Sequence, residues 1–164
     1  MFMAERKPRI YVASPYGFDE ARKPFYYDKF IPAIREAIDC AILDPWEWGS
    51  RIIHENFVAE DDVRGLRKRN MAIARRNLKG LNEADGIVAV LDGVDVDSGV
   101  AFEIGFAHAQ KKPVVEYRGD FRPSGENAGC TVNLMVEYPT LVRGDRVARN
   151  LNELIEQMKE VFGK

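Results

Sequence analysis

The chain has 164 residues, 46% of them hydrophobic and 30% charged, which is typical of one soluble globular domain. Its 24 basic and 26 acidic residues give a net charge of −2, and we expect no nucleic-acid partner, because proteins that bind a phosphate backbone carry a basic surplus. No apolar run approaches the roughly 18 residues of a membrane span, so we expect no membrane partner. The two cysteines lack CxxC spacing and the charged start does not resemble a signal peptide; both features favour the cytoplasm.

The first half of the chain alternates between strand and helix patterns. The β-branched run "RIYVASP" (9–15) ends in Ser-Pro and predicts a buried strand followed by a loop. Apolar residues at helical spacing predict a helix over 21–39. A second strand, "CAILDPW" (40–46), ends in Asp-Pro, and residues 60–82 again have a helical pattern.

The second half continues this alternation. The near-continuous apolar run "DGIVAVLDG" (85–93) predicts a central parallel strand that is covered on both faces. A helix over 99–111 and a strand over 112–117 follow. A glycine-rich loop (118–131) then leads into "TVNLMVEY", and the chain finishes with an amphipathic helix over 150–163.

This order of elements predicts a single-domain α/β fold over residues 1–164. We expect a doubly wound, mostly parallel sheet of five strands with helices on both faces, of the Rossmann or flavodoxin type. Ligands in such folds bind beyond the carboxyl ends of the strands. The candidate ligand-binding segments are therefore 14–18, 44–48 and 92–99, which follow the first three predicted strands.

The stretch "LDGVDVDSGVAFEIGFAHA" (91–109) places Glu103 in a helix that is apolar around nearly its whole circumference, which predicts a buried helix. A buried ionised carboxylate is costly, so Glu103 requires a cation, a place at the helix edge or a chemical role. Asp97 fits the N-cap of this helix, where a carboxylate accepts hydrogen bonds from free backbone N–H groups. Two carboxylates around one pocket can cleave a glycosidic bond with retention. They can also hold a divalent metal ion, although no phosphate-binding GxxxxGK[ST] loop accompanies them.

Four stretches resemble the nucleoside 2-deoxyribosyltransferase family. They are "IYVASP" (10–15), "RNLKGLNEADGIVAVLDG" (76–93), "DSGVAFEIGFAHAQKKPVV" (97–115) and "VNLM" (132–135), in the family's order. The third is the most specific, because Asp-x-Gly followed by x-Ala-Phe-Glu-x-Gly is close to diagnostic of the superfamily. The "NLM" triplet points to the transferase branch.

The resemblance implies roles for five residues. Glu103 matches the nucleophile that attacks C1′ of a 2′-deoxynucleoside and forms a covalent deoxyribosyl-enzyme, from which a second nucleobase takes the sugar with net retention. Asp97 matches the carboxylate that hydrogen-bonds the nucleobase and helps to protonate it, and Tyr11 matches a tyrosine that orients the nucleophile. Asn133 and Met135 match a pair at the 5′-hydroxyl that a neighbouring subunit contributes, which implies a homo-oligomer with shared sites. No metal or organic cofactor is implied.

Further candidates for substrate binding surround this set. Asn77 stands where some family members have an aspartate, and because an amide cannot titrate we expect hydrogen bonding there without proton transfer. The aromatic residues after the first two strands either stack on a base or anchor their loops. The full set of additional candidates is Ser14, Pro15, Asp44, Trp46, Asn77, Asp92 and Gly99.

Two other functions remain open at this point. One is an N-glycosidase of the same superfamily that hydrolyses 2′-deoxynucleoside 5′-monophosphates, for which Arg118, Arg122 and Ser124 could supply phosphate donors. The amide and thioether of "NLM" favour a free 5′-hydroxyl instead. The other is a catalytically silent nucleotide-binding module, because fold alone does not determine function.

Overall fold

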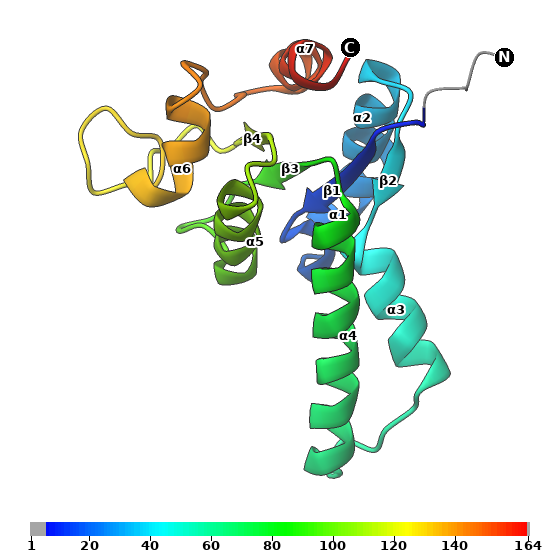
Figure 1. Cartoon of the computed structure of the whole chain (residues 1–164). Coiled ribbons are helices and arrows are strands. Elements are labelled where there is room, and N and C mark those ends of the chain that lie inside the picture. Colours follow the sequence, from blue (N-terminus) through cyan, green and yellow to red (C-terminus); the bar gives the residue numbers. More distant parts are fainter. Residues whose placement is uncertain (1–5, 164) are drawn as a thin grey trace, which may run out of the picture.

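Four short runs of β-branched and small apolar residues form one parallel sheet at the centre of the protein (Figure 1). The computed structural model describes residues 6–163; residues 1–5, in the charged start from which we expected no signal peptide, and residue 164 lie outside the described residues. All strand pairings are parallel and helices cover both faces, so the predicted doubly wound α/β class is confirmed. The strands are β1 (Arg9–Ala13), β2 (Ala41–Leu43), β3 (Gly86–Val90) and β4 (Val114–Tyr117), in the order β2-β1-β3-β4.

The sheet has four strands rather than the five that we expected. After β4 the described chain returns to the sheet only at Ala148, which forms a single parallel bridge with Tyr117. The intervening "LMVEYPTL" forms helix α6 (Leu134–Leu141), because the side chain of Asn133 accepts the backbone N–H of Met135 and caps the helix.

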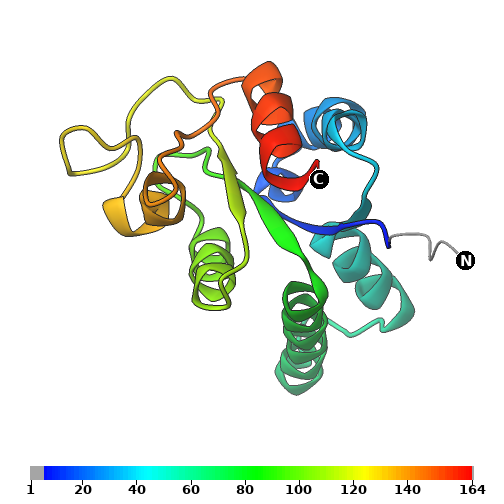
Figure 2. The ribbon, with the colours of Figure 1, turned by 45° about the horizontal axis from the view of Figure 1, so that its top comes forward.

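One face of the sheet is covered by helices from the two ends of the chain. Figure 2 shows the last helix beside the early ones on this side. Phe30 and Ile34 pack with Leu154 and Met158 in one buried cluster, which includes Val12 of β1. The predicted helix over 21–39 is confirmed, with one π-helical turn in it. The elements are η1 (Tyr16–Phe18), α1 (Arg22–Phe25), η2 (Tyr26–Phe30), α2 (Ile31–Ala37) and α7 (Leu151–Phe162).

The opposite face carries the residues that matter for the site. Successive strand residues point to opposite faces, so Tyr11 lies in a second buried cluster, on the other side of the sheet from its neighbours Ile10 and Val12. There it packs with Leu81, Val100 and Ile104 of the covering helices. These helices are α3 (Pro45–Glu55), α4 (Val63–Glu83) and α5 (Ser98–Ala109).

Helix α3 was not anticipated, although its start has a clear local cause. Asp44 accepts the backbone N–H of Trp46 and Pro45 occupies the first helical turn, a favourable beginning for a helix. It packs against the predicted helix α4, and the two project together beyond the sheet (Figure 1). Among the described residues, no helix combines the length and apolar character that crossing a membrane requires.

Helix α5 is less buried than its composition suggested. Val100, Ile104 and Ala107 face the core, whereas Phe102 on the other side is 59% exposed. An apolar circumference predicts burial on all sides, but within one chain only part of it is covered by β3, β1 and α6.

Glu116 of β4 provides a test of this packing. Its carboxylate is fully buried, near Glu137 and beside the hydroxyl of Thr140. Burial, with the charge of Glu137 adding to it, raises the pKa of Glu116 from 4.5 to about 8. The folded state therefore holds a proton that the unfolded state releases between these pH values. This contribution to stability is complete below 4.5 and is lost as the pH rises through about 8.

We expect Glu116→Gln to flatten the pH dependence of stability over this interval. The wild-type protein should lose up to about 1.4 kcal/mol per pH unit there, because one proton is released on unfolding. Denaturant unfolding at a series of pH values measures this slope. Glu160→Gln, on the exposed side of α7, is the control. A variant slope equal to that of the wild type would contradict the assignment of a buried, protonated Glu116.

Candidate active site

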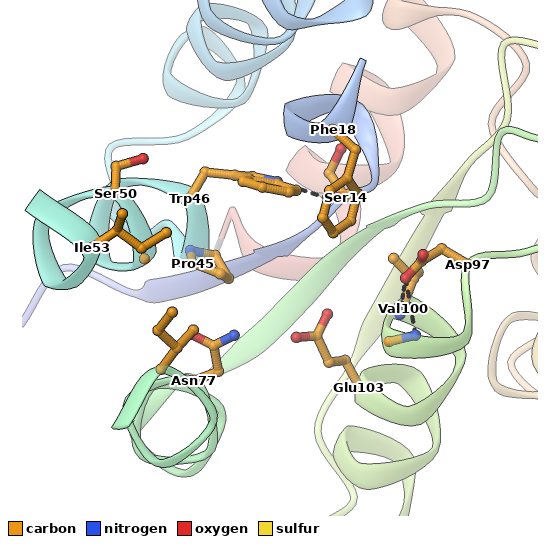
Figure 3. A pocket seen from close by; sticks show the side chains of 13 residues that line it. Ser14, Phe18, Pro45, Trp46, Ser50, Ile53, Asn77, Asp97, Val100 and Glu103 are labelled. Atoms are coloured by element: carbon orange, nitrogen blue, oxygen red, sulfur yellow. Dashed lines mark hydrogen bonds between the residues drawn. The ribbon is translucent and has the colours of Figure 1, made fainter. Parts of the chain in front are cut away.

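A cavity of about 330 Å³ lies at the carboxyl edge of the sheet, between α3, α4 and α5 (Figure 3). This is within the usual size range of small-molecule sites, and most of its lining is apolar. Residues that follow β1, β2 and β3 all contribute to it, as expected for a fold that switches crossover direction between β1 and β3. The lining residues are Ser14, Phe18, Pro45, Trp46, Gly49, Ser50, Ile53, Ile73, Asn77, Asp97, Gly99, Val100 and Glu103.

Glu103 projects into this cavity from the second turn of α5 (Figure 3). The hydroxyl of Tyr11, from β1, donates a hydrogen bond of 2.5 Å to its Oε1. Because Tyr11 is fully buried in the sheet, its ring has little freedom and the hydrogen bond holds the carboxylate in one orientation. No cation among the described residues pairs with Glu103, so an ion pair does not explain why a carboxylate is buried at this position.

The surroundings of Glu103 raise its pKa to about 7. Burial is the main cause and the negative charge of Asp97 adds to it, while the hydrogen bond from Tyr11 acts in the opposite direction. Burial and the nearby charge of Glu103 raise the pKa of Tyr11 well above its usual value, so the hydroxyl stays protonated and remains a donor. The carboxylate is thus poised to change charge near neutral pH, as functional carboxyl groups often are.

Asp97 occupies the N-cap of α5, as its position in the sequence suggested. Its Oδ1 accepts hydrogen bonds from the backbone N–H groups of Gly99 (2.9 Å) and Val100 (3.1 Å), drawn as dashed lines in Figure 3. Among the described residues, Oδ2 accepts no hydrogen bond. One oxygen therefore stabilises the helix, and the other is available to a ligand in the cavity that Asp97 lines.

An aromatic wall forms one side of the cavity. The indole N–H of Trp46 donates to the backbone oxygen of Ser14 (2.8 Å). The rings of Phe18 and Trp46 pack edge to face, with their centroids 4.4 Å apart. Gly17 makes this possible, because a Cβ there would lie 2.1 Å from an atom of the indole ring. The wall therefore presents fixed aromatic surfaces against which a flat base can pack.

Asn77 closes the cavity on the side of α4. Figure 3 shows its side chain directed into the cavity, across from the carboxylate of Glu103. Its Oδ1 is buried and has no hydrogen-bond partner among the described residues. A buried unpaired amide oxygen is unfavourable unless a ligand or water satisfies it. The neighbouring Ile53 and Ile73 make this end of the cavity apolar.

Three other residues predicted to bind substrate lie outside the cavity lining. Pro15 precedes the short helix η1. Asp44 caps α3 and accepts a hydrogen bond from the hydroxyl of Tyr26 (3.0 Å). Asp92 accepts hydrogen bonds from the hydroxyl of Tyr16 and from the backbone N–H of residue 120 (2.9 Å). Within this chain, Asp44 joins the start of α3 to η2, and Asp92 joins η1 to the loop after β4.

Asn133 and Met135 also lie away from their own chain's cavity. Besides capping α6, Asn133 donates a hydrogen bond from its side chain to Glu126 (2.9 Å), and Met135 is 71% exposed. Neither residue is therefore among those that line the cavity of its own chain.

Sequence reasoning missed the part of the cavity that α3 and the middle of α4 supply. The signal was present in Asp44-Pro45, which is a strong helix start, and in the apolar spacing of the residues after it. Recognising this helix would have placed its inner face at the carboxyl edge of β2. The missed lining residues on these two helices are Gly49, Ser50, Ile53 and Ile73, and Val100 of α5 was missed as well.

The arginines of the loop after β4 serve the fold. Arg118 is only 1% exposed and donates to the backbone oxygens of Leu91, Gly93 and Arg122. Arg122 pairs with Asp120. No lysine or arginine is among the residues described as lining the cavity. Within residues 6–163, no group of three or more His, Cys, Asp or Glu side chains is arranged to hold a metal ion.

Comparison with known proteins identifies the family of the chain. A family model described as nucleoside 2-deoxyribosyltransferase matches residues 10–135, well over half of the chain. The chain belongs to the nucleoside 2-deoxyribosyltransferase family. The matched region includes Tyr11, Asp97 and Glu103, and it ends at Met135. A search among curated proteins finds no match.

Solved structures resemble the chain over most of its length. A conserved protein from Enterococcus faecalis V583 has a TM-score of 0.64 at 26% identity, covering 94% of this chain and 99% of that one. A 2-desoxiribosyltransferase from Leishmania mexicana has a TM-score of 0.65 at 24% identity, covering 93% and 97%. A 2-deoxyribosyltransferase from Bacillus psychrosaccharolyticus has a TM-score of 0.56 at 23% identity, covering 80% and 81%. The two transferases, at these identities, establish the shared fold.

The two oxygens of Asp97 can be tested separately. Asp97→Asn keeps a capping acceptor and should leave stability nearly unchanged, whereas Asp97→Ala should cost about 1 kcal/mol, the usual value for a lost cap. Asn also removes the charge that raises the pKa of Glu103, so that pKa should fall below about 7. Thermal unfolding and NMR titration of Glu103 measure the two effects. Equal destabilisation by both substitutions would show that a neutral acceptor cannot replace the carboxylate in the cap.

Proposed function

We propose that the chain transfers 2-deoxyribose from a 2′-deoxynucleoside to another nucleobase, with retention at C1′. The observation that carries the proposal is the hydrogen-bonded Glu103 carboxylate in a largely apolar cavity that Asp97 also lines. A carboxylate removed from water is a stronger nucleophile, and a second carboxyl group at the same cavity can assist the leaving group. Membership of the family supports this substrate class.

In the first half of the proposed reaction, an ionised oxygen of Glu103 attacks C1′ as the C1′–N bond to the base breaks. The bonding electrons leave with the nucleobase, and Asp97 hydrogen-bonds the base and helps to protonate it. Tyr11 keeps Glu103 directed at C1′ through its hydrogen bond. The product is a deoxyribosyl ester of Glu103, with C1′ inverted.

In the second half, a nitrogen of the incoming nucleobase attacks C1′ and the ester bond to Glu103 breaks. The carboxylate is regenerated, and the proton lost by the incoming base passes to the group that protonated the first one. The second inversion restores the original configuration. Trp46 and Phe18 provide the surface against which each base packs, and Asn77 offers an amide for hydrogen bonding without proton transfer.

A free nucleoside suits this cavity better than a nucleotide. Phosphate groups are usually bound by arginine, lysine or free backbone N–H groups. Those of Gly99 and Val100 are taken by Asp97, and Arg118 is engaged with backbone oxygens. We therefore favour transfer from nucleosides over hydrolysis of 5′-monophosphates. The free thiols of Cys40 and Cys130 fit our further proposal that the enzyme acts in the cytoplasm, in nucleoside salvage.

We also propose that the working enzyme is a homo-oligomer in which Asn133 and Met135 complete the site of a neighbouring subunit. Helices α5 and α6 pack against each other, and both carry exposed apolar side chains. A second copy covering this surface would bury it. The exposed apolar residues are Phe102, Leu134, Met135, Tyr138, Leu141 and Val142.

The transfer reaction can be tested by chromatography of the protein with deoxyinosine, with and without adenine. We expect deoxyadenosine to form with the wild-type protein and to be lost in Glu103→Ala. The rate should fall as the pH drops below about 7, because Glu103 must be ionised to attack. Thymidine with cytosine tests pyrimidines in the same way. Free hypoxanthine without transfer would assign a hydrolase, and no turnover with any nucleoside or deoxynucleotide would leave a binding module.

Shared sites predict complementation between two inactive variants. One carries Glu103→Ala and the other Asn133→Ser with Met135→Ala; serine is chosen because it keeps the cap of α6. After the two are unfolded and refolded together, mixed oligomers should regain part of the activity, since one site in each pair is intact. Each variant refolded alone is the control. Mixed oligomers that form, as shown by two affinity tags, but stay inactive would contradict shared sites.

A further inference from the structure

Trp48 lies behind the proposed nucleophile rather than in the cavity. It is on α3, half-buried, and is not among the lining residues. Its ring packs against the ring of Tyr11, with the centroids 6.3 Å apart and the planes tilted by 58°. Trp48 therefore contacts the residue whose hydroxyl holds Glu103, and stacking on a base is not the role that its position indicates.

Two residues of helix α4, Gly80 and Arg76, contact Trp48 and keep it against Tyr11. A Cβ on Gly80 would lie 2.5 Å from the edge of the Trp48 ring and 3.3 Å from Cε2 of Tyr11, so both rings converge on a glycine. One turn earlier, the guanidinium of Arg76 lies over the Trp48 ring, with its central carbon 3.5 Å from the ring centroid. A cation at this distance is attracted by the ring and resists its rotation.

These contacts form a continuous chain of packed groups from α4 to the reacting carboxylate. Arg76 and Gly80 define the position of Trp48, Trp48 bears on Tyr11, and the Tyr11 hydroxyl donates to Glu103. A tyrosine ring in a sheet can still tilt about its side-chain bonds if a neighbour is removed. A hydrogen bond weakens steeply as its geometry departs from linearity.

We propose that Trp48 is a positioning residue. Because Arg76 and Gly80 hold its ring in place, Trp48 keeps the Tyr11 hydroxyl on Glu103 and so sets the orientation and charge state of that carboxylate. Tyr11 from β1 and Asp97 at the start of α5 are the ionisable groups that act on Glu103. Loss of the Trp48 support should weaken the Tyr11 hydrogen bond while leaving Asp97 in place.

The test compares Tyr11→Phe, Trp48→Leu and the double variant by NMR titration of Glu103, whose carboxyl signal is assigned by its absence in Glu103→Gln. Tyr11→Phe removes a hydrogen bond that lowers the pKa of Glu103, so this pKa should rise. Trp48→Leu should shift it in the same direction, and the double variant should shift it no further than Tyr11→Phe alone. Trp48→Phe, which retains a ring, should restore most of the wild-type titration.

Two controls separate positioning from stability. Ile52→Ala lies one turn further along α3, outside the cavity lining, and should lower the melting temperature without moving the titration of Glu103. Arg76→Met keeps an apolar stem over the indole and should shift the pKa of Glu103 less than Trp48→Leu does. The Arg76 variant also provides the test if Trp48→Leu does not fold. A wild-type titration in the folded Trp48 variants, or shifts that add in the double variant, would overturn the inference.

The consequence for turnover rests on the proposed function. If the transfer reaction holds, Trp48→Leu should reduce kcat by about ten-fold or more with a smaller change in KM, because the nucleophile is misdirected while the base subsite is intact. The titration requires no turnover. An inactive wild-type protein with coupled titration shifts would therefore reject the proposed function alone, and active protein without these shifts would reject the positioning role alone.

Discussion

The hydrogen bond between Tyr11 and Glu103 is the interaction on which the site depends. It joins the central strand of the sheet to the helix that follows β3, across 92 positions of sequence. Both groups are removed from water, which raises the pKa of each, and the shared proton stays on the tyrosine. An ionised Glu103 is thereby held in one direction without a cation beside it. A cation would stabilise the carboxylate and reduce its reactivity as a nucleophile.

The helix that carries Glu103 combines structural and chemical demands. Asp97 uses one oxygen for the cap of α5 and lines the cavity with the same side chain. The position of the second carboxyl group relative to Glu103 therefore follows from the start of the helix. Because one side chain does both, the effect of the Asp97 charge can be separated from its effect on protein stability only by a substitution that preserves a capping acceptor.

The projecting pair of α3 and α4 has two functions in the fold. Its inner face supplies the apolar end of the cavity through Ile53, Ile73 and Asn77. The ends nearer the sheet support Tyr11 through Trp48 and Gly80. In the proposed reaction, base binding and orientation of the nucleophile are therefore linked through the same two helices. The exposed apolar side chains of α5 and α6, such as Phe102 and Met135, are not part of this support.

The amino-acid sequence by itself determined the α/β class, the four strands, the cap at Asp97 and the membership indicated by "DSGVAFEIG", because each follows from local periodicity or from a specific motif. It did not determine that α3 would line the cavity, that Asp44 and Asp92 would form hydrogen bonds outside the cavity, or that Trp48 would pack against Tyr11. Side-chain direction at the end of a strand depends on what packs beside it, and that neighbour comes from a distant part of the chain. The expected fifth strand is absent from the described residues: the chain after β4 forms α6, capped by Asn133, and it returns to β4 through a single bridge at Ala148.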